Sequence, residues 1–151
     1  MQRLRSLVAR PGTVVLALLL ATGAVAMAAP ARAATTDVVE QSSRLPVGAE
    51  ADGAPVDLDV SVFTSRGATG RHPAVVLAHG FGGSKVDSAV WARRLARAGY
   101  VAVTYTARGF GASGGLIHLD APAYEVADAA KVVDLLAARA DVLLDAPGDP
   151  R

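Results

Sequence analysis

The chain has 151 residues, which is enough for one domain, and 52% of them are hydrophobic. Its 15 basic and 14 acidic residues give a formal net charge of +1, a balance that argues against a nucleic acid as its partner. It contains no cysteine, so disulfide scaffolds and thiolate metal sites are excluded.

Residues 1–33 have the features of an export signal. Three arginines within the first ten residues precede a nearly unbroken apolar stretch from Val14 to Ala29. The stretch is too short to cross the hydrocarbon core of a bilayer as a helix, and the small-x-small pattern of a cleavage site ends at Ala33. We expect a signal peptide over residues 1–33, cleavage near Ala33 and a secreted or extracytoplasmic mature chain, with an uncleaved membrane anchor as the alternative.

Residues 34–151 would form the mature domain, and its first part predicts two outer strands. Residues 34–50 are polar and indicate at most one short strand. After the turn dipeptide Asp52-Gly53, apolar residues from Val56 to Val62 alternate with polar ones. A period of two predicts a strand with one solvent-exposed face, which we place in antiparallel pairing at the edge of a sheet.

A buried strand and a helix come next. Ala74–Ala78 is apolar at every position, as expected of a strand that helices cover on both faces. A helix is predicted from about Asp87, a suitable N-cap, to Ala98, and Gly99 is a natural stop after it. The residues expected to face inward are Val90, Trp91, Leu95 and Ala98.

The alternation of strand and helix then repeats. Tyr100–Tyr105 predicts a second buried strand, the glycine-rich segment Arg108–Gly115 follows, and a second helix runs from about Pro122 to Ala140. Its inward residues are expected to be Val126, Ala129, Val133 and Leu136. The acidic residues in and before this helix are interpreted as capping and solvated positions: Asp120, Glu125, Asp128 and Asp134. Together the elements predict an α/β fold, with a mixed, mostly parallel sheet and flanking helices on both faces.

The segment between the first buried strand and its helix, His79-Gly80-Phe81-Gly82-Gly83, is the strongest candidate for chemistry. Acyl transfer turns a carbonyl oxygen into an oxyanion, which needs pre-aimed hydrogen-bond donors. A glycine-rich turn at the carboxyl end of a buried strand can aim backbone N–H groups outward. We therefore predict that the Phe81 backbone N–H is an oxyanion donor and that His79, Gly80 and Gly82 support the turn. On the sequence alone, an ordinary strand-to-helix turn explains the segment equally well.

Other pattern matches are rejected. Ser113 lies in a G-x-S-x-G match and Gly109–Gly114 matches G-x-G-x-x-G, but neither segment opens a helix directly after a strand. Lys85 follows a hydroxyl residue instead of preceding one, so its segment is not a phosphate-binding loop. The three histidines, at positions 72, 79 and 118, are far apart in the sequence. Since a metal site needs three or four convergent ligands, we expect no metal and no cofactor.

The glycine motifs together resemble those of secreted bacterial α/β-hydrolases. The segments that carry the resemblance are Ala78–Gly83 and Tyr105–Gly115, with Ile117–Asp120, Tyr124–Asp128 and Gly148–Arg151 in support. The chain looks most similar to the branch of Xaa-Pro dipeptidyl-peptidases and cocaine-esterase-like enzymes, over about residues 45–151. Thr106 stands where many relatives have an acid, so the resemblance gives no charge partner for Arg108.

The resemblance implies a serine hydrolase that acts on a peptide or ester bond of a small substrate. Its nucleophile, acid and histidine base are expected beyond Arg151, so the chain would be an N-terminal fragment, inactive alone. The strand at 74–78 would then keep one unpaired, aggregation-prone edge. The alternative is a non-catalytic exported half-domain that serves as a binding or pairing module, while a nucleotide-binding domain rests only on the rejected glycine patterns. Without the export signal the chain is mildly acidic, so we expect no nucleic acid as a partner and membrane contact only through that signal.

Overall fold

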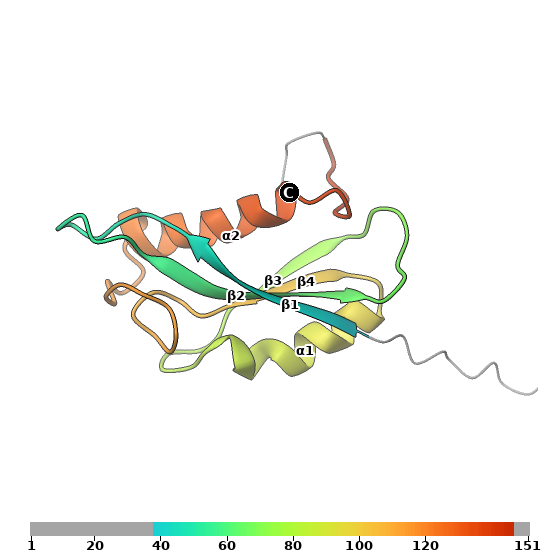
Figure 1. Cartoon of the computed structure of the whole chain (residues 1–151), viewed down its shortest axis with the longest axis horizontal. Coiled ribbons are helices and arrows are strands. Elements are labelled where there is room, and N and C mark those ends of the chain that lie inside the picture. Colours follow the sequence, from blue (N-terminus) through green and yellow to red (C-terminus); the bar gives the residue numbers. More distant parts are fainter. Residues whose placement is uncertain (1–37, 147–151) are drawn as a thin grey trace, which may run out of the picture. The chain divides into compact units, whose positions relative to one another are not determined.

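The computed structural model describes residues 38–146 (Figure 1). Residues 1–37, with the expected export signal and its cleavage site, and residues 147–151 lie outside this range. The described strands form one sheet of order β1-β2-β4-β3, with helices in the connections. In chain order the elements are β1 (Val38–Pro46), β2 (Asp57–Ser65), β3 (Ala74–Leu77), α1 (Lys85–Arg97), β4 (Val101–Tyr105), the π-helical turn η1 (Pro122–Val126) and α2 (Ala127–Ala137).

The sheet is mixed, as the sequence predicts. β1 pairs with β2 and β2 with β4 in antiparallel registers, whereas β3 pairs with β4 in parallel. Three details of the prediction are wrong. Among the described strands the sheet is mostly antiparallel instead of mostly parallel, β1 is nine residues long, and β2 lies inside the sheet instead of at its edge. β1 carries little sequence signal because an edge strand needs only backbone pairing, and its side chains at 40–44 are polar and exposed.

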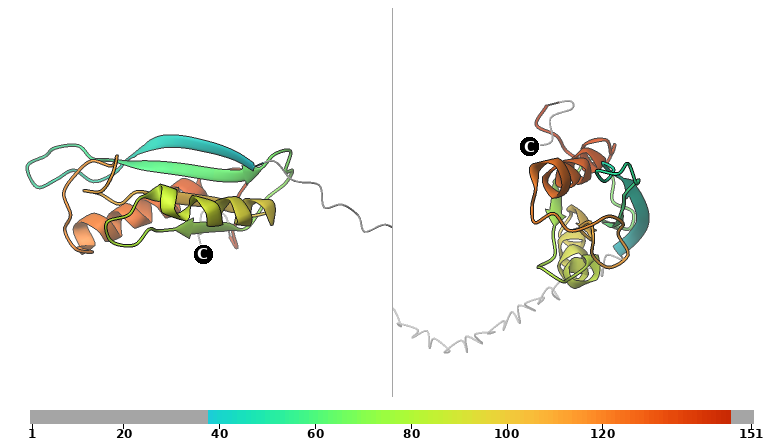
Figure 2. Two further views of the ribbon diagram at one scale, coloured as in Figure 1. Left: turned by 90° about the horizontal axis from the view of Figure 1, so that it is seen from below. Right: turned by 90° about the vertical axis from the view of Figure 1, so that its left-hand side faces the viewer.

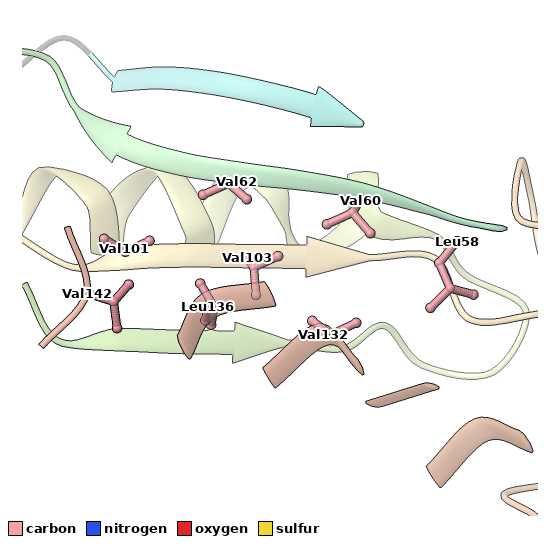
Figure 3. Close-up of a cluster of buried hydrophobic side chains, with 8 residues drawn as sticks. All are labelled: Leu58, Val60, Val62, Val101, Val103, Val132, Leu136 and Val142. Atoms are coloured by element: carbon pink, nitrogen blue, oxygen red, sulfur yellow. The ribbon is translucent and has the colours of Figure 1, made fainter. Parts of the chain in front are cut away.

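α1 covers one face of the sheet and α2 covers the other (Figure 2). Between α2 and the sheet lies a buried cluster of apolar side chains (Figure 3). Its members are Leu58, Val60, Val62, Val101, Val103, Val132, Leu136 and Val142. On the opposite face, Phe63 and Ala102 pack against α1. Because both faces are covered, Ser61 on β2 is as buried as its neighbour Val62, and the predicted solvent-exposed face of this strand is wrong.

β4, and not β3, is the fully buried strand. The residues of β4 from Val101 to Thr104 are at most 1% exposed, whereas all four residues of β3 are half-buried. In the described part of the chain, the outer edge of β3 pairs only where the chain enters it, through a parallel bridge between His72 and Val142. The expectation that helices cover both faces of this strand is confirmed, because Val75 and Leu77 pack toward α1 and Ala74 and Val76 pack toward α2. Its half-buried state comes from its open outer edge, since a strand at a sheet edge keeps one side open.

α1 begins two residues earlier than predicted and turns a different face inward. Ser84 is the N-cap, and Asp87 completes a capping box by accepting the Ser84 backbone N–H. Three alanines of α1 are buried, while the predicted inward residues Val90 and Trp91 are 56% and 59% exposed. Small residues let a helix approach a sheet closely, so the alanine stripe takes the inner face. The predicted stop at Gly99 is confirmed by its φ of +92°.

The second helix is divided into two parts. It starts with the π turn η1, continues as α2 and ends at Ala137, three residues before the predicted end. A π turn holds one extra residue and shifts the inward face of everything that follows. The buried residues of α2 are therefore Asp128, Val132 and Leu136, and of the predicted stripe only Leu136 is fully buried. No helix within residues 38–146 is long and apolar enough to span a membrane.

Candidate functional site

The segments that follow β3 and β4 come together at one end of the sheet (Figure 1). Parallel strands bring their carboxyl ends to the same end of the sheet, and this end is where α/β sheets bind ligands. The two segments are joined by a hydrogen bond in which the Ala107 backbone N–H donates to Nε2 of His79 over 2.9 Å. The predicted glycine turn and the glycine-rich segment after β4 therefore share one site.

The turn after β3 is tight and lies outside α1. Its closing bond runs from the Gly83 N–H to the Gly80 carbonyl over 3.0 Å, and Gly82 has a φ of +79°. No acceptor within the described residues receives the Phe81 N–H, and the Phe81 side chain is 84% exposed. The Phe81 ring contacts the edge of Phe110, with ring centroids 5.3 Å apart. This N–H is thus free to donate to a ligand, and its role as an oxyanion donor stays a prediction.

His79 is held by both of its ring nitrogens. Nε2 accepts the Ala107 N–H, and Nδ1 lies 2.7 Å from the Gly80 carbonyl oxygen, to which it donates. Only the neutral tautomer with its proton on Nδ1 makes both bonds. The ring also meets Phe110 edge-on at 5.5 Å. His79 therefore contacts both the turn and the segment after β4, and its role in supporting an oxyanion turn stays a prediction.

Ser113 has a structural place. Its hydroxyl donates to the Thr106 carbonyl over 2.6 Å and accepts the Asp59 backbone N–H over 2.9 Å. Because both functions of this hydroxyl are used and no helix follows, the G-x-S-x-G match is not a nucleophile elbow. Lys85 is structural too, since its Nζ lies 2.6 Å from the Asp59 carboxylate and its backbone N–H donates to the Thr106 hydroxyl.

A buried arginine anchors the segment after β4. Arg108 is fully buried and donates through Nε and Nη2 to the two carboxylate oxygens of Asp128, over 2.6 and 2.7 Å. It also donates to Glu50 over 3.1 Å and to the Gly48 carbonyl over 3.0 Å. The hydrogen bonding of Arg108 to the Asp128 carboxylate is the main cause that raises the pKa of Arg108. The interpretation of Asp128 as a solvated position is therefore wrong, because it is the buried partner of this guanidinium.

Glu50 joins the same network from the connection between β1 and β2. Its carboxylate accepts the Leu116 backbone N–H over 2.9 Å and faces Nε2 of His118 at 2.7 Å. The Leu116 N–H is the main cause that lowers the pKa of Glu50; burial opposes it and His118 and Arg108 add to it. The His118 ring in turn stacks on Tyr124, with ring centroids 3.6 Å apart. Sequence reasoning missed Glu50 altogether.

Glu125 fixes the end of this segment, as a capping residue should. Its carboxylate accepts the N–H groups of His118 and Ala121 over 2.6 and 3.0 Å. Burial raises the pKa of Glu125, but the donated N–H groups outweigh it and the net pKa is lowered. The two residues between them, Leu119 and Asp120, adopt left-handed conformations with φ of +53° and +59°. Such a backbone is costly for residues other than glycine, so the surrounding contacts hold it in place.

Two adjoining cavities open beside the turn. One of about 300 Å³ is lined by Tyr105, Arg108 and Asp128, and one of about 220 Å³ by Phe81, Phe110 and apolar residues that follow it. Both share four lining residues, namely His79, Ala107, Asp120 and Glu125. Burial raises the pKa of the Tyr105 hydroxyl, with further contributions from the Asp128 and Asp120 carboxylates. Nowhere in residues 38–146 do three metal-ligating side chains gather.

Comparisons with known proteins agree on the fold. Residues 70–143 match the model of a family described as serine aminopeptidase, S33. A hypothetical protein from Pseudomonas aeruginosa is similar at 24% identity, with a TM-score of 0.57 over 70% of this chain and 32% of that one. Bromoperoxidase from Bacillus anthracis is similar at 23% identity, with a TM-score of 0.50 over 64% and 31%. The chain has an α/β-hydrolase fold.

A third similar structure extends over more of the chain. Brefeldin A esterase, a bacterial homologue of human hormone-sensitive lipase, is 22% identical, with a TM-score of 0.51 over 83% of this chain and 30% of that one. None of the curated proteins matches the chain. In the three similar structures named above, the chain spans about a third of the length of each protein. The comparisons do not single out the Xaa-Pro dipeptidyl-peptidase branch.

The candidate site thus combines predicted and unpredicted residues. His79, Gly80, Phe81 and Gly82 lie together in the predicted turn. Asp128 could have been found from its spacing, since a carboxylate four residues before Val132 shares the buried face of the helix. Glu50 has no such signal, because 58 residues separate it from the arginine it meets.

Proposed function

We propose that this chain supplies the oxyanion turn and part of the substrate cavity of an exported serine hydrolase of Xaa-Pro dipeptidyl-peptidase type, acting on peptide or ester bonds. The observation that carries the proposal is the Phe81 N–H, which has no acceptor within the described residues and lies at the carboxyl end of β3, beside the 220 Å³ cavity. The match to the serine aminopeptidase family and the α/β-hydrolase fold support it.

In the proposed reaction, a serine attacks the scissile carbonyl and a histidine moves the proton to the leaving group. Negative charge develops on the carbonyl oxygen, and the Phe81 N–H donates to that oxygen in the transition state. Because a backbone donor in a tight turn is already aimed, it needs no rearrangement when the charge forms. The neighbouring cavities would receive the groups on either side of the bond.

The nucleophile is proposed to come from a segment outside those described, since Ser113 is held in a structural role. The outer edge of β3 offers a place for such a segment, because beyond the bridge to Val142 the described chain leaves that edge open. A strand that paired in parallel with the outer edge of β3 would have its carboxyl end at the same end of the sheet as the turn.

The test is to remove the Phe81 N–H and keep everything else. In the protein expressed from its complete coding region, Phe81→Pro deletes the donor, whereas the matched control Phe81→Ala keeps it and removes only an exposed ring. We expect Phe81→Pro to lower kcat on a chromogenic ester or Xaa-Pro anilide by about 10²–10³-fold, the usual loss for one oxyanion donor. An unchanged kcat in a Pro variant that melts like the parent would contradict the proposal.

Two further measurements address the finer parts. The ratio of rates on matched ester and Xaa-Pro amide substrates separates esterase from peptidase. Export is tested by the mass of the protein recovered outside the cytoplasm, which should correspond to a chain that starts near Ala34. An intact N-terminus on membrane-bound protein would favour the uncleaved anchor.

The open edge of β3 also favours a second function, a non-catalytic module that pairs with another chain. Such a module would be a soluble dimer in sedimentation and would not react with a serine-directed fluorophosphonate. Labelling of the purified protein would reject this alternative.

A further inference from the structure

The link between the turn after β3 and the segment after β4 depends on a single proton position. The Ala107 N–H reaches Nε2 of His79 at 2.9 Å, and the Gly80 carbonyl is 2.7 Å from Nδ1. Each bond uses one ring nitrogen, so the imidazole must be neutral with its proton on Nδ1.

The two partners of His79 differ in how firmly they are held. Ala107 precedes Arg108, whose guanidinium is buried against Asp128 and Glu50, so the Ala107 N–H is a fixed point. Gly80 belongs to the turn itself. Within the described residues, the bond from Ala107 to His79 is the polar contact that joins residues 79–83 to the segment 107–115.

Protonation of the ring has a one-sided effect. A proton added at Nε2 replaces the acceptor lone pair with a second N–H, which then faces the Ala107 N–H. The bond from Nδ1 to the Gly80 carbonyl survives, because Nδ1 keeps its proton. The turn is therefore released from its neighbour without being unfolded.

We propose that His79 is a positioning residue: in its neutral Nδ1–H form it ties the oxyanion turn to the segment after β4, and protonation of its ring loosens that tie. The effect of this contact on catalysis rests on the proposed function, because the group that His79 would position is the Phe81 N–H. The Phe110 ring contacts the rings of both His79 and Phe81, so we expect a displacement of His79 to reach the Phe81 N–H through Phe110.

Other titratable groups surround the ring and must be separated from it in any test. They are Asp87 on α1, Tyr105 at the end of β4, Arg108 after β4, Asp120 and Glu125 around the start of η1, and Asp128 on α2. His79→Gln separates them, because its side-chain oxygen can accept the Ala107 N–H but cannot titrate. His79→Leu removes the acceptor altogether.

The experiment is nuclear magnetic resonance on the ¹⁵N-labelled protein. The chemical shifts of the His79 ring nitrogens report the tautomer directly. The rate of amide hydrogen exchange at Ala107, corrected for its intrinsic pH dependence, reports the hydrogen bond from Ala107 to His79. We expect a pyrrole-type Nδ1 and a pyridine-type Nε2 at neutral pH. When the ring protonates, Ala107 exchange should rise about five-fold, the loss expected for one net hydrogen bond. The Phe81 amide resonance should shift over the same pH range.

The variants decide the assignment. In His79→Gln, Ala107 exchange should stay slow and lose this pH response, and in His79→Leu it should be fast throughout. An Nε2–H tautomer, an Ala107 amide that ignores the titration of the ring, or an unchanged pH response in His79→Gln would each overturn the proposal. Should His79→Leu not fold, the parent and His79→Gln still decide it. None of these measurements needs enzymatic activity, so a failed Phe81→Pro test leaves their outcome readable.

Discussion

The turn after β3 and the segment after β4 lie side by side, yet they are held by interactions of different kinds. Buried charges hold the segment after β4, where Arg108 meets Asp128 and Glu50. The turn after β3 is held by one neutral imidazole and a tight backbone. A buried ion pair is costly to disturb, whereas a neutral hydrogen bond can be switched by one proton. Buried charge pairs thus hold one segment of the site, and neutral hydrogen bonds hold the other.

The largest effect is expected from removing the buried ion pair between Arg108 and Asp128. Asp128→Ala leaves the Arg108 guanidinium buried without its main partner, which typically costs about 3–5 kcal/mol. The matched control is Asp134→Ala on the same helix, where a 63% exposed carboxylate faces Lys131 and should matter by less than about 0.5 kcal/mol. Urea unfolding of both variants measures the difference, and equal losses would show that the pair does not anchor the segment.

A smaller effect should separate two glycines with the same backbone strain. Gly109 and Gly82 have φ of +75° and +79°, so alanine at either one costs about 1–2 kcal/mol. A Cβ at Gly109 would also lie 2.7 Å from the Ile117 backbone nitrogen, while one at Gly82 meets nothing within 4 Å. We expect Gly109→Ala to cost about 1–3 kcal/mol more than Gly82→Ala in thermal unfolding. Equal losses of stability in the two variants would mean that the segment after β4 accommodates an added Cβ as easily as the turn does.

The smallest effect is a change in acid sensitivity. The pKa of Glu50 is lowered in the folded state, so the unfolded chain binds this proton at a higher pH than the folded chain does. Its contribution to stability is present above the usual glutamate value of about 4.3 and is lost as the pH falls below it. Glu50→Gln should therefore flatten the fall in unfolding free energy between roughly pH 5 and pH 3. If the unfolding free energy of the variant fell with pH as steeply as that of the parent chain, Glu50 would not contribute to the acid sensitivity.

Local patterns predicted what local residues determine. The glycine turn, the stop at Gly99 and the mixed sheet follow from short stretches of sequence. Periodicity failed on α1 because it favours large apolar residues such as Trp91, whereas close contact with the sheet selects alanine. Glu50 was out of reach, because its meeting with Arg108 depends on how distant segments fold together.

The place of β4 in the sheet has a kinetic consequence. β1 and β2 pair across a short connection, and β3 and β4 pair across α1, so each half closes a modest loop. Within the sheet, the two halves join where β4 meets β2, as at Val62 and Val103. Closing this seam brings together distant segments before their contacts can compensate the lost chain entropy. We expect the docking of these two strands to limit the rate at which the domain assembles.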